Sequence, residues 1–209
     1  MDAGHLLGPT GPLARGVSGY EHRPGQIRMA RAVQDALEHD GVILIEAGTG
    51  TGKTWAYLIP AALSGRRVLV STGTRALQDQ IMEKDLPALE RHLGLDIDAA
   101  CVKGLSNYLC RRRFQELSSS TDAVHPRFAR SLPVVRSWIE TTNSGDRAAL
   151  ASISEEDPIW SRVVSGSDTR IGARCDFYDD CFVTRVRRRA ESAQLVVVNH
   201  HLFFADLAL

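Results

Sequence analysis

The sequence of 209 residues contains no apolar run approaching the roughly 18 residues that a membrane-spanning helix needs. Residues 1–15 also lack the basic and then apolar pattern of a secretion signal. Both absences predict a cytoplasmic protein with no membrane partner. Net charge is absent too, since 25 basic residues balance 25 acidic ones, so no overall positive field indicates a nucleic-acid partner.

Lysine and cysteine are scarce. Lys53, Lys84 and Lys103 are the only lysines, so arginine carries nearly all the positive charge. Arginine suits phosphate binding and base stacking, although genome composition produces the same bias. Four cysteines without a secretion signal argue against a disulfide scaffold and leave metal ligation, a reactive thiol or simple burial as alternatives.

Apolar periodicity predicts alternating strands and helices in the first half of the chain. Helical spacing begins at Pro24, residues 42–45 form a short apolar run, and a helix is expected over residues 53–63. A second buried strand is expected at residues 67–71, and a third helix near Thr74. This alternation predicts a doubly wound, mainly parallel α/β domain with right-handed crossovers.

The alternation stops over residues 104–194, where helical patterns at 108–117, 127–141 and 177–192 predict a helical insertion. It returns with the apolar strand pattern of residues 195–198. Glycines and prolines near the N-terminus predict a loop or loosely packed arm. We therefore divide the chain into an arm (1–19), the first part of an α/β domain (20–103), the insertion (104–194) and a return to the α/β domain (195–209). The chain is interpreted as a fragment of a longer protein.

A phosphate-binding loop lies between the expected strand at 42–45 and the expected helix at 53–63, which is the context that the motif requires. Its glycines allow backbone N–H groups to surround phosphate oxygens, Lys53 reaches the β and γ phosphates, and the Thr54 hydroxyl binds Mg²⁺. Lys53 and Thr54 are thus the candidate catalytic residues. The expected nucleotide-binding residues are Gly48, Thr49, Gly50, Thr51, Gly52, Lys53 and Thr54.

Residues on both sides of this loop narrow the prediction. Tyr20, Arg23 and Gln26 precede the first helix and are able to stack on and hydrogen-bond an adenine, although alone they also suit a surface turn. The second strand ends in small hydroxylated residues at the edge of the sheet where doubly wound folds bind ligands. The candidates there for holding a nucleic-acid backbone are Thr72, Thr74 and Arg75.

Taken together, these segments resemble the DinG/XPD-like superfamily-2 DNA helicases, in particular the bacterial DinG and YoaA branch. The resemblance covers nearly the whole chain from Tyr20 and rests on the segments YEHRPGQ, EAGTGTGKT, STGTRALQDQ, KGLSNYLCRRR and RRRAESAQLVVVNHHLFFADL. It implies a RecA-like motor domain that uses ATP and Mg²⁺ to move 5′ to 3′ on single-stranded DNA. Its implied partners are single-stranded DNA, forked or tailed duplex DNA and the remainder of its own helicase chain.

The resemblance also implies an iron–sulfur domain, inserted between the phosphate loop and a metal-binding DEAH motif. Cys110, Cys175 and Cys181 match three of the four family ligands of a [4Fe–4S] cluster, and the fourth position holds Arg170, which stays protonated and does not bind iron. Three alternatives are open: a cluster with another fourth ligand such as Asp168 or water, a domain that has lost its cluster, or zinc. If a cluster site persists, the three cysteines should lie close together in the fold.

Two basic runs adjoin the matching cysteines, whereas the middle of the insertion is acidic. This segregation favours a local phosphate-binding track, although a solvated helix face is the alternative. The candidate DNA contacts are Arg111, Arg112, Arg113, Arg187 and Arg188.

We interpret the chain as the N-terminal part of an ATP-dependent DNA helicase, acting in DNA repair or replication. The alternatives are a non-catalytic nucleotide- or DNA-binding regulatory fragment, and an unrelated phosphate-loop kinase or ATPase. No DEAH motif occurs within residues 1–209, so we expect this segment alone not to hydrolyse ATP.

Overall fold

The computed structural model describes residues 2–207, which fold as two compact units. The first unit contains the residues up to 101 and those from 192 onward, and the second contains residues 102–191. Each unit has its own hydrophobic core. No helix within residues 2–207 has both the length and the apolar character needed to cross a membrane.

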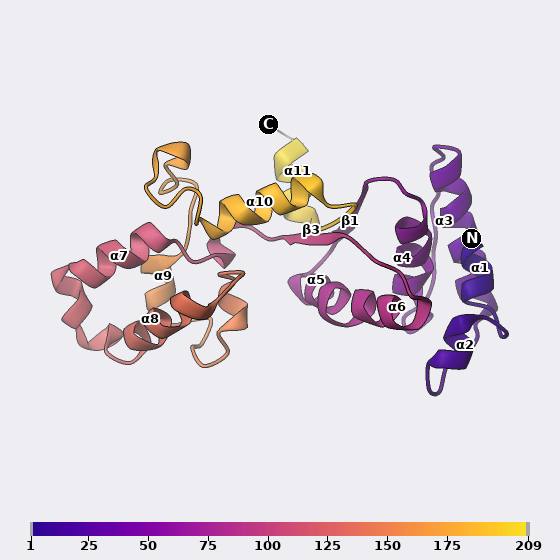
Figure 1. Cartoon of the computed structure of the whole chain (residues 1–209), viewed down its shortest axis with the longest axis horizontal. Coiled ribbons are helices and arrows are strands. Elements are labelled where there is room, and N and C mark those ends of the chain that lie inside the picture. The colour runs from indigo at the N-terminus through magenta and orange to yellow at the C-terminus, as the bar shows by residue number, and fades with distance from the viewer. Residues whose placement is uncertain (1, 208–209) are drawn as a thin grey trace. The chain divides into compact units, whose positions relative to one another are not determined.

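The first unit combines a small sheet with helices (Figure 1). Its elements are α1 (Ala3–Leu6), α2 (Pro12–Gly16), α3 (Pro24–Glu38), α4 (Lys53–Leu63), β1 (Val68–Thr72), α5 (Arg75–Gln80), a π-helical turn (Ile81–Asp85), α6 (Leu86–Leu93), β2 (Ala99–Val102), β3 (Leu195–Asn199) and α11 (His200–Leu207).

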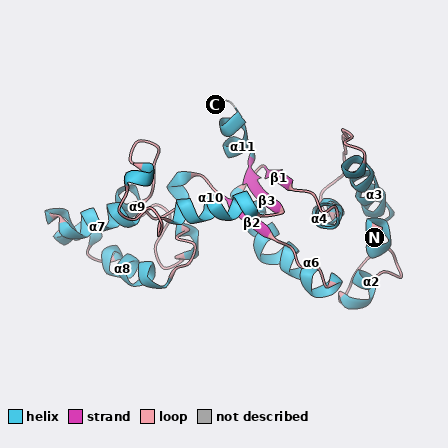
Figure 2. Ribbon diagram, turned by 45° about the horizontal axis from the view of Figure 1, so that its top comes forward, coloured by secondary structure: helices cyan, strands magenta, loops and turns pink. Residues whose placement is uncertain are grey.

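The sheet has the strand order β1–β3–β2 (Figure 2). Strands β1 and β3 are parallel, and their register runs from Val68 opposite Leu195 to Thr72 opposite Asn199. The strands predicted at 67–71 and 195–198 are therefore confirmed, and the chain re-enters the sheet directly beside β1 after the helical block. A small parallel sheet with helices is consistent with the predicted RecA-like α/β fold.

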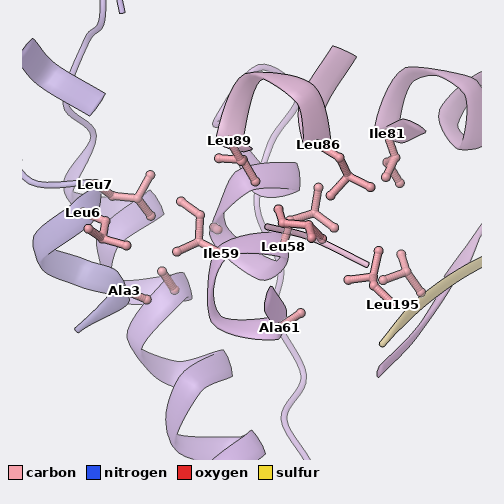
Figure 3. Close-up of a cluster of buried hydrophobic side chains, with 14 of the residues drawn as sticks. Ala3, Leu6, Leu7, Leu58, Ile59, Ala61, Ile81, Leu86, Leu89 and Leu195 are labelled. Carbon is pink, nitrogen blue, oxygen red and sulfur yellow. The ribbon is translucent and has the colours of Figure 1, made fainter. Parts of the chain in front are cut away.

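Helix α4 forms the centre of the first core. Leu58 and Ile59 are fully buried, and Figure 3 shows them between Leu6 of α1 on one side and Leu86 and Leu195 on the other. Because α4 begins at Lys53, this packing also fixes the position of the helix N-terminus that follows the phosphate loop.

The strand predicted at residues 42–45 is wrong. The segment belongs to no strand, and Val42 and Leu44 are 103% and 99% exposed. A strand requires backbone hydrogen bonds to a neighbour, and no strand within residues 2–207 pairs with this segment. The apolar residues of this segment favour a strand, but the local sequence does not show whether a neighbouring strand is present to pair with it.

The prediction of a loose N-terminal arm is also wrong. Helices α1 and α2 form there, Leu7 and Leu13 are fully buried, and the Tyr20 hydroxyl donates to the Leu7 carbonyl at 2.9 Å. Pro12 occupies the first turn of α2, where its missing N–H costs no hydrogen bond. The glycines and prolines here begin and end helices, and the leucines between them attach the segment to the core.

The second unit is mainly helical, in agreement with the helical patterns in its sequence. It contains α7 (Arg111–Ser119), α8 (Ser131–Thr141), α9 (Ile159–Val163), α10 (Phe182–Ser192) and several single 3₁₀ turns. Helix α7 begins three residues later than predicted because Tyr108 and Leu109 form antiparallel bridges with Asp146 and Val164. The late starts of α8 and α10 follow from the turns that precede them.

Candidate functional site

The phosphate loop has a backbone that only glycine accommodates easily at two positions. Gly50 and Gly52 have φ of 73° and 77°, in the left-handed region that side chains disfavour. A Cβ atom on Gly52 would also lie 2.3 Å from the amide nitrogen of Gln26. The loop can therefore approach α3 closely, and its glycines are required by conformation as well as by the access they give to a ligand.

The side chain of Lys53 is held across this loop. Its Nζ donates to the carbonyl of Ala47 at 2.9 Å and to that of Gly48 at 2.6 Å, and the Thr51 hydroxyl also donates to Gly48 at 3.0 Å. These contacts keep the ammonium group at the loop, with the N-terminus of α4 directly behind it. Both features favour an anion at this position.

The segment before α3 contacts the same loop. Arg23 donates to the Gly50 carbonyl at 2.6 Å and pairs with Glu21 at 3.0 Å, while Gln26 donates to the Gly52 carbonyl at 2.9 Å. Arg23 and Gln26 were predicted as adenine-binding residues from sequence. The structure brings them to the phosphate loop, and it directs the Tyr20 hydroxyl to Leu7.

One pocket of about 620 Å³ unites these residues. Its volume is in the usual range for small-molecule sites. The sequence-predicted residues that line it are Tyr20, Arg23, Gln26, Thr49, Gly50, Thr51, Gly52, Lys53 and Thr54. Gly48 contributes its carbonyl to the contacts of Lys53 and is not among the lining residues.

Thr54 is further positioned by Tyr57, one turn later on α4. Burial raises the pKa of the Tyr57 phenol, and the nearby Asp85 carboxylate raises it further, while a hydrogen bond with the Thr54 side chain lowers it. The Tyr57 hydroxyl is therefore protonated at neutral pH and bonds to the Thr54 hydroxyl.

Sequence reasoning missed six residues that line this pocket, namely Val17, Gly19, Glu21, Trp55, Gln80 and Asp85. The Trp55 Nε1 donates to Asp85 Oδ1 at 2.8 Å, and the Gln80 amide donates to Asp85 Oδ2 at 3.0 Å. The only signal in the sequence was proximity, since Trp55 directly follows the phosphate-loop motif.

The predicted nucleic-acid contacts at the end of β1 have local structural roles. The Thr72 hydroxyl is buried and donates toward the carbonyls of Thr74 and Val198 at 3.1 and 3.3 Å. The Thr74 hydroxyl accepts from the Leu77 N–H at 3.2 Å and caps α5. Thr74 and Arg75 are exposed.

In the second unit, Cys110, Cys175 and Cys181 line one small cavity together with Arg170. Cys110 therefore reaches the wall of the same cavity as Cys175 and Cys181, although it is distant from them in sequence. The Arg170 guanidinium donates to the Thr184 hydroxyl at 3.2 Å. Arg170 therefore occupies the wall of the cavity at the place where the family resemblance assigned a fourth thiol.

These residues do not fit a [4Fe–4S] cluster. The cavity is about 30 Å³, room for one or two water molecules. Within residues 2–207, no three cysteine, histidine or acidic side chains are arranged to hold a metal ion. Asp168, the alternative fourth ligand, is exposed, accepts a hydrogen bond from Ser167 at 2.8 Å and does not line the cavity.

The first basic run, which consists of Arg111, Arg112 and Arg113, makes contacts within the second unit. Arg111 stacks on the Phe182 ring at 4.5 Å. Arg112 donates to the Thr169 carbonyl at 2.6 Å, and Arg113 donates to the Val164 carbonyl at 2.6 Å. These internal contacts give all three arginines a structural role.

The second basic run, which contains Arg187 and Arg188, lies on α10. Arg187 is exposed, whereas Arg188 pairs with Asp179 at 3.0 Å and lies 5.5 Å from the centre of the Tyr178 ring. The ion pair with Asp179 raises the pKa of Arg188 and keeps it charged. Both side chains belong to a helix surface that presents positive charge.

A parallel sheet, a phosphate loop at the start of α4 and a pocket around that loop define a phosphate-loop nucleotide-binding protein. The DEAD/DEAH box helicase family model matches residues 26–128, which include this loop. Residues 26–128 are thus similar to the helicases of this family.

The chain is also similar to individual proteins. The chain is 40% identical over 201 residues to the ATP-dependent DNA helicase YoaA of Escherichia coli, covering 96% of this chain and 32% of the relative. It is 35% identical over 216 residues to the ATP-dependent helicase DinG of Mycobacterium tuberculosis, covering 93% and 32%. It is also 35% identical to a Bacillus subtilis protein named 3′-5′ exonuclease DinG, of which it covers 21%. The chain spans about a third or less of the length of these relatives.

Proposed function

We propose that this chain is the nucleotide-binding part of an ATP-dependent DNA helicase that moves 5′ to 3′ on single-stranded DNA and unwinds forked or tailed duplexes in DNA repair or replication. The observation that carries this proposal is the pocket around the phosphate loop. It unites Lys53, Thr54, Arg23 and Gln26, which lie on different elements, around one volume suited to a nucleotide.

In this proposal different residues of the pocket bind different parts of ATP. The Lys53 ammonium and the N–H groups at the start of α4 neutralise the β and γ phosphates. Tyr20 and the free donors of Arg23 and Gln26 bind the adenine side of the pocket. Since Arg23 and Gln26 also hold loop carbonyls, they couple the base side to the conformation of the phosphate loop.

A Mg²⁺ ion would be held by Thr54, whose hydroxyl is fixed by Tyr57 at the pocket wall. The ion supplies charge neutralisation at the phosphates. Coupling to translocation would require the remainder of the helicase chain as partner. We also place the protein in the cytoplasm.

For DNA binding, we propose exposed residues of two surfaces. Thr74 and Arg75, with the buried Thr72 supporting them, follow β1, and Arg187 and Arg188 lie on α10. Arg111, Arg112 and Arg113 contribute by shaping the second unit and by the charge they carry near its surface. We do not include an iron–sulfur cluster or zinc in the proposed function, because the cavity residues do not fit either ion site.

The test is calorimetric ATP binding to the chain with and without Lys53→Ala. Loss of a charge-assisted contact, worth about 1.5–3 kcal/mol, should weaken binding by about tenfold or more. Lys84→Ala is the matched control, because Lys84 is exposed and outside the pocket. Equal ATP affinity in the Lys53→Ala and unsubstituted proteins would contradict the proposal, because ATP binding would then not depend on the phosphate loop.

A further inference from the structure

We propose that Trp55, oriented by Asp85, forms an aromatic wall that binds the nucleoside half of the ligand irrespective of its base. This inference rests on the proposed function, since it concerns the same nucleotide pocket. It assigns binding to a residue outside the phosphate-loop motif and a positioning role to a carboxylate on another element.

The location of Trp55 provides the first argument. It directly follows Thr54 on α4 and lines the pocket that the phosphate loop also lines. Its ring is half-buried and packs against the first core. An indole at this position offers a large apolar surface to a nucleoside, and stacking against an aromatic ring tolerates any base.

The second argument is how the indole is held. Asp85 accepts from the Trp55 Nε1 at 2.8 Å with one carboxylate oxygen and from the Gln80 amide at 3.0 Å with the other. With both oxygens engaged, the carboxylate has a fixed orientation. The indole is thereby anchored at its polar edge, so that its ring does not need to be ordered when a ligand arrives.

The third argument explains why Gln80 and Asp85 meet. They are five residues apart, a spacing that places side chains on different faces of an α-helix. The intervening residues form a π turn, with the Leu86 N–H bonded to the Ile81 carbonyl five residues back. In such a turn residues five apart lie one above the other, so the π turn brings Asp85 to Gln80. π turns are rare and occur frequently at functional sites.

The experiment compares ATP, GTP and inorganic tripolyphosphate binding to the full chain by calorimetry. Trp55→Ala should weaken ATP and GTP by the same factor, about fivefold or more, and leave tripolyphosphate binding unchanged. Trp55→Phe, which retains an aromatic ring, should recover most of the loss and covers the case in which the alanine variant fails to fold. A parallel loss of tripolyphosphate binding, or unchanged ATP binding, would overturn the inference.

The positioning role of Asp85 toward the Trp55 indole is tested by measuring the nucleotide affinity of Asp85 variants. Asp85→Ala should weaken ATP and GTP but not tripolyphosphate, and Asp85→Asn, which keeps an oxygen for the indole N–H, should restore the affinity. Glu83→Ala is the matched control, because Glu83 is an exposed carboxylate of the same π turn outside the pocket. Equal effects of Asp85→Ala and Glu83→Ala would refute the positioning role.

Different results would refute the proposed function and the aromatic wall at Trp55. If the unsubstituted chain binds neither ATP nor tripolyphosphate, the proposed function itself is wrong. If it binds both and the Trp55 and Asp85 variants bind ATP normally, only the aromatic wall is wrong.

Discussion

Lys103 and Asp146 form a buried ion pair, with 2.5 Å between Nζ and Oδ2 and with side chains only 8% and 15% exposed. Asp146 also bridges to Tyr108, whose hydroxyl accepts from the Lys103 N–H at 3.0 Å. The start of the second unit is thereby connected to its middle through charge, backbone and a phenol.

We expect Lys103→Met to destabilise the second unit by about 3 kcal/mol, because it leaves the Asp146 carboxylate buried without its cation. Urea unfolding should be followed by tryptophan emission in a Trp55→Phe background, where Trp138 and Trp160 report on the second unit. The double variant Lys103→Met, Asp146→Leu should recover part of the loss. Arg187→Ala, an exposed change in the same unit, is the control. A loss no larger than this control's would show that the pair contributes little.

Gly52→Ala should abolish tight nucleotide binding. The substitution faces an unfavourable φ of 77° and places a Cβ atom 2.3 Å from the Gln26 amide nitrogen. Either the loop or Gln26 must move, and both belong to the pocket. Gly65→Ala is the control, since Gly65 also has positive φ but no neighbour within 4 Å of the added atom. Calorimetric ATP affinities that match between the two variants would mean that strain at Gly52 does not reach the pocket.

Residues 1–209 alone should hydrolyse ATP negligibly, with or without single-stranded DNA. The sequence of this segment has no DEAH motif to hold the metal and orient water. A chain extended through the second motor domain should show hydrolysis that single-stranded DNA stimulates. Phosphate release assays on both proteins provide the measurement. Robust turnover by residues 1–209 would locate catalytic groups that we have not identified.

Arg170→Cys alone should not increase iron retention after anaerobic reconstitution, because the cavity of about 30 Å³ has no room for a cluster and no three cysteine, histidine or acidic side chains within residues 2–207 are arranged to hold a metal ion. The change removes a guanidinium from the wall of the cavity and adds a fourth thiol beside Cys110, Cys175 and Cys181. Iron and sulfide contents with an absorption spectrum measure the effect, and Arg174→Cys, at an exposed position outside the cavity, is the control. More iron in Arg170→Cys than in Arg174→Cys would show that the cavity accepts a cluster once a fourth thiol is supplied.

Local sequence patterns predicted much of the fold. The phosphate loop followed by α4, the parallel strands β1 and β3 and the helical character of residues 102–191 all follow from periodicity and turn residues. These features depend on interactions that are close in sequence, or on apolar runs that any sheet would bury.

The errors concern interactions that sequence does not encode locally. Residues 42–45 have strand propensity, yet hydrogen bonding depends on a neighbour that residues 2–207 do not supply. The sequence also could not show that Arg111 contacts the Phe182 ring and that Arg113 donates to the Val164 carbonyl, and their predicted DNA contacts stay a prediction. Asp85 could not be assigned to the pocket because its position depends on a π turn that has no recognised sequence signal.

The exposed segment 42–45 has a consequence for handling the protein. An exposed apolar run outside any sheet is a template for adding a strand from another molecule, and Val42 and Leu44 are fully exposed with no strand of residues 2–207 paired to them. Solutions of this 209-residue chain should therefore self-associate as concentration rises, through intermolecular sheet formation at this segment. Lysine at positions 42 and 44 would act as a gatekeeper against that assembly.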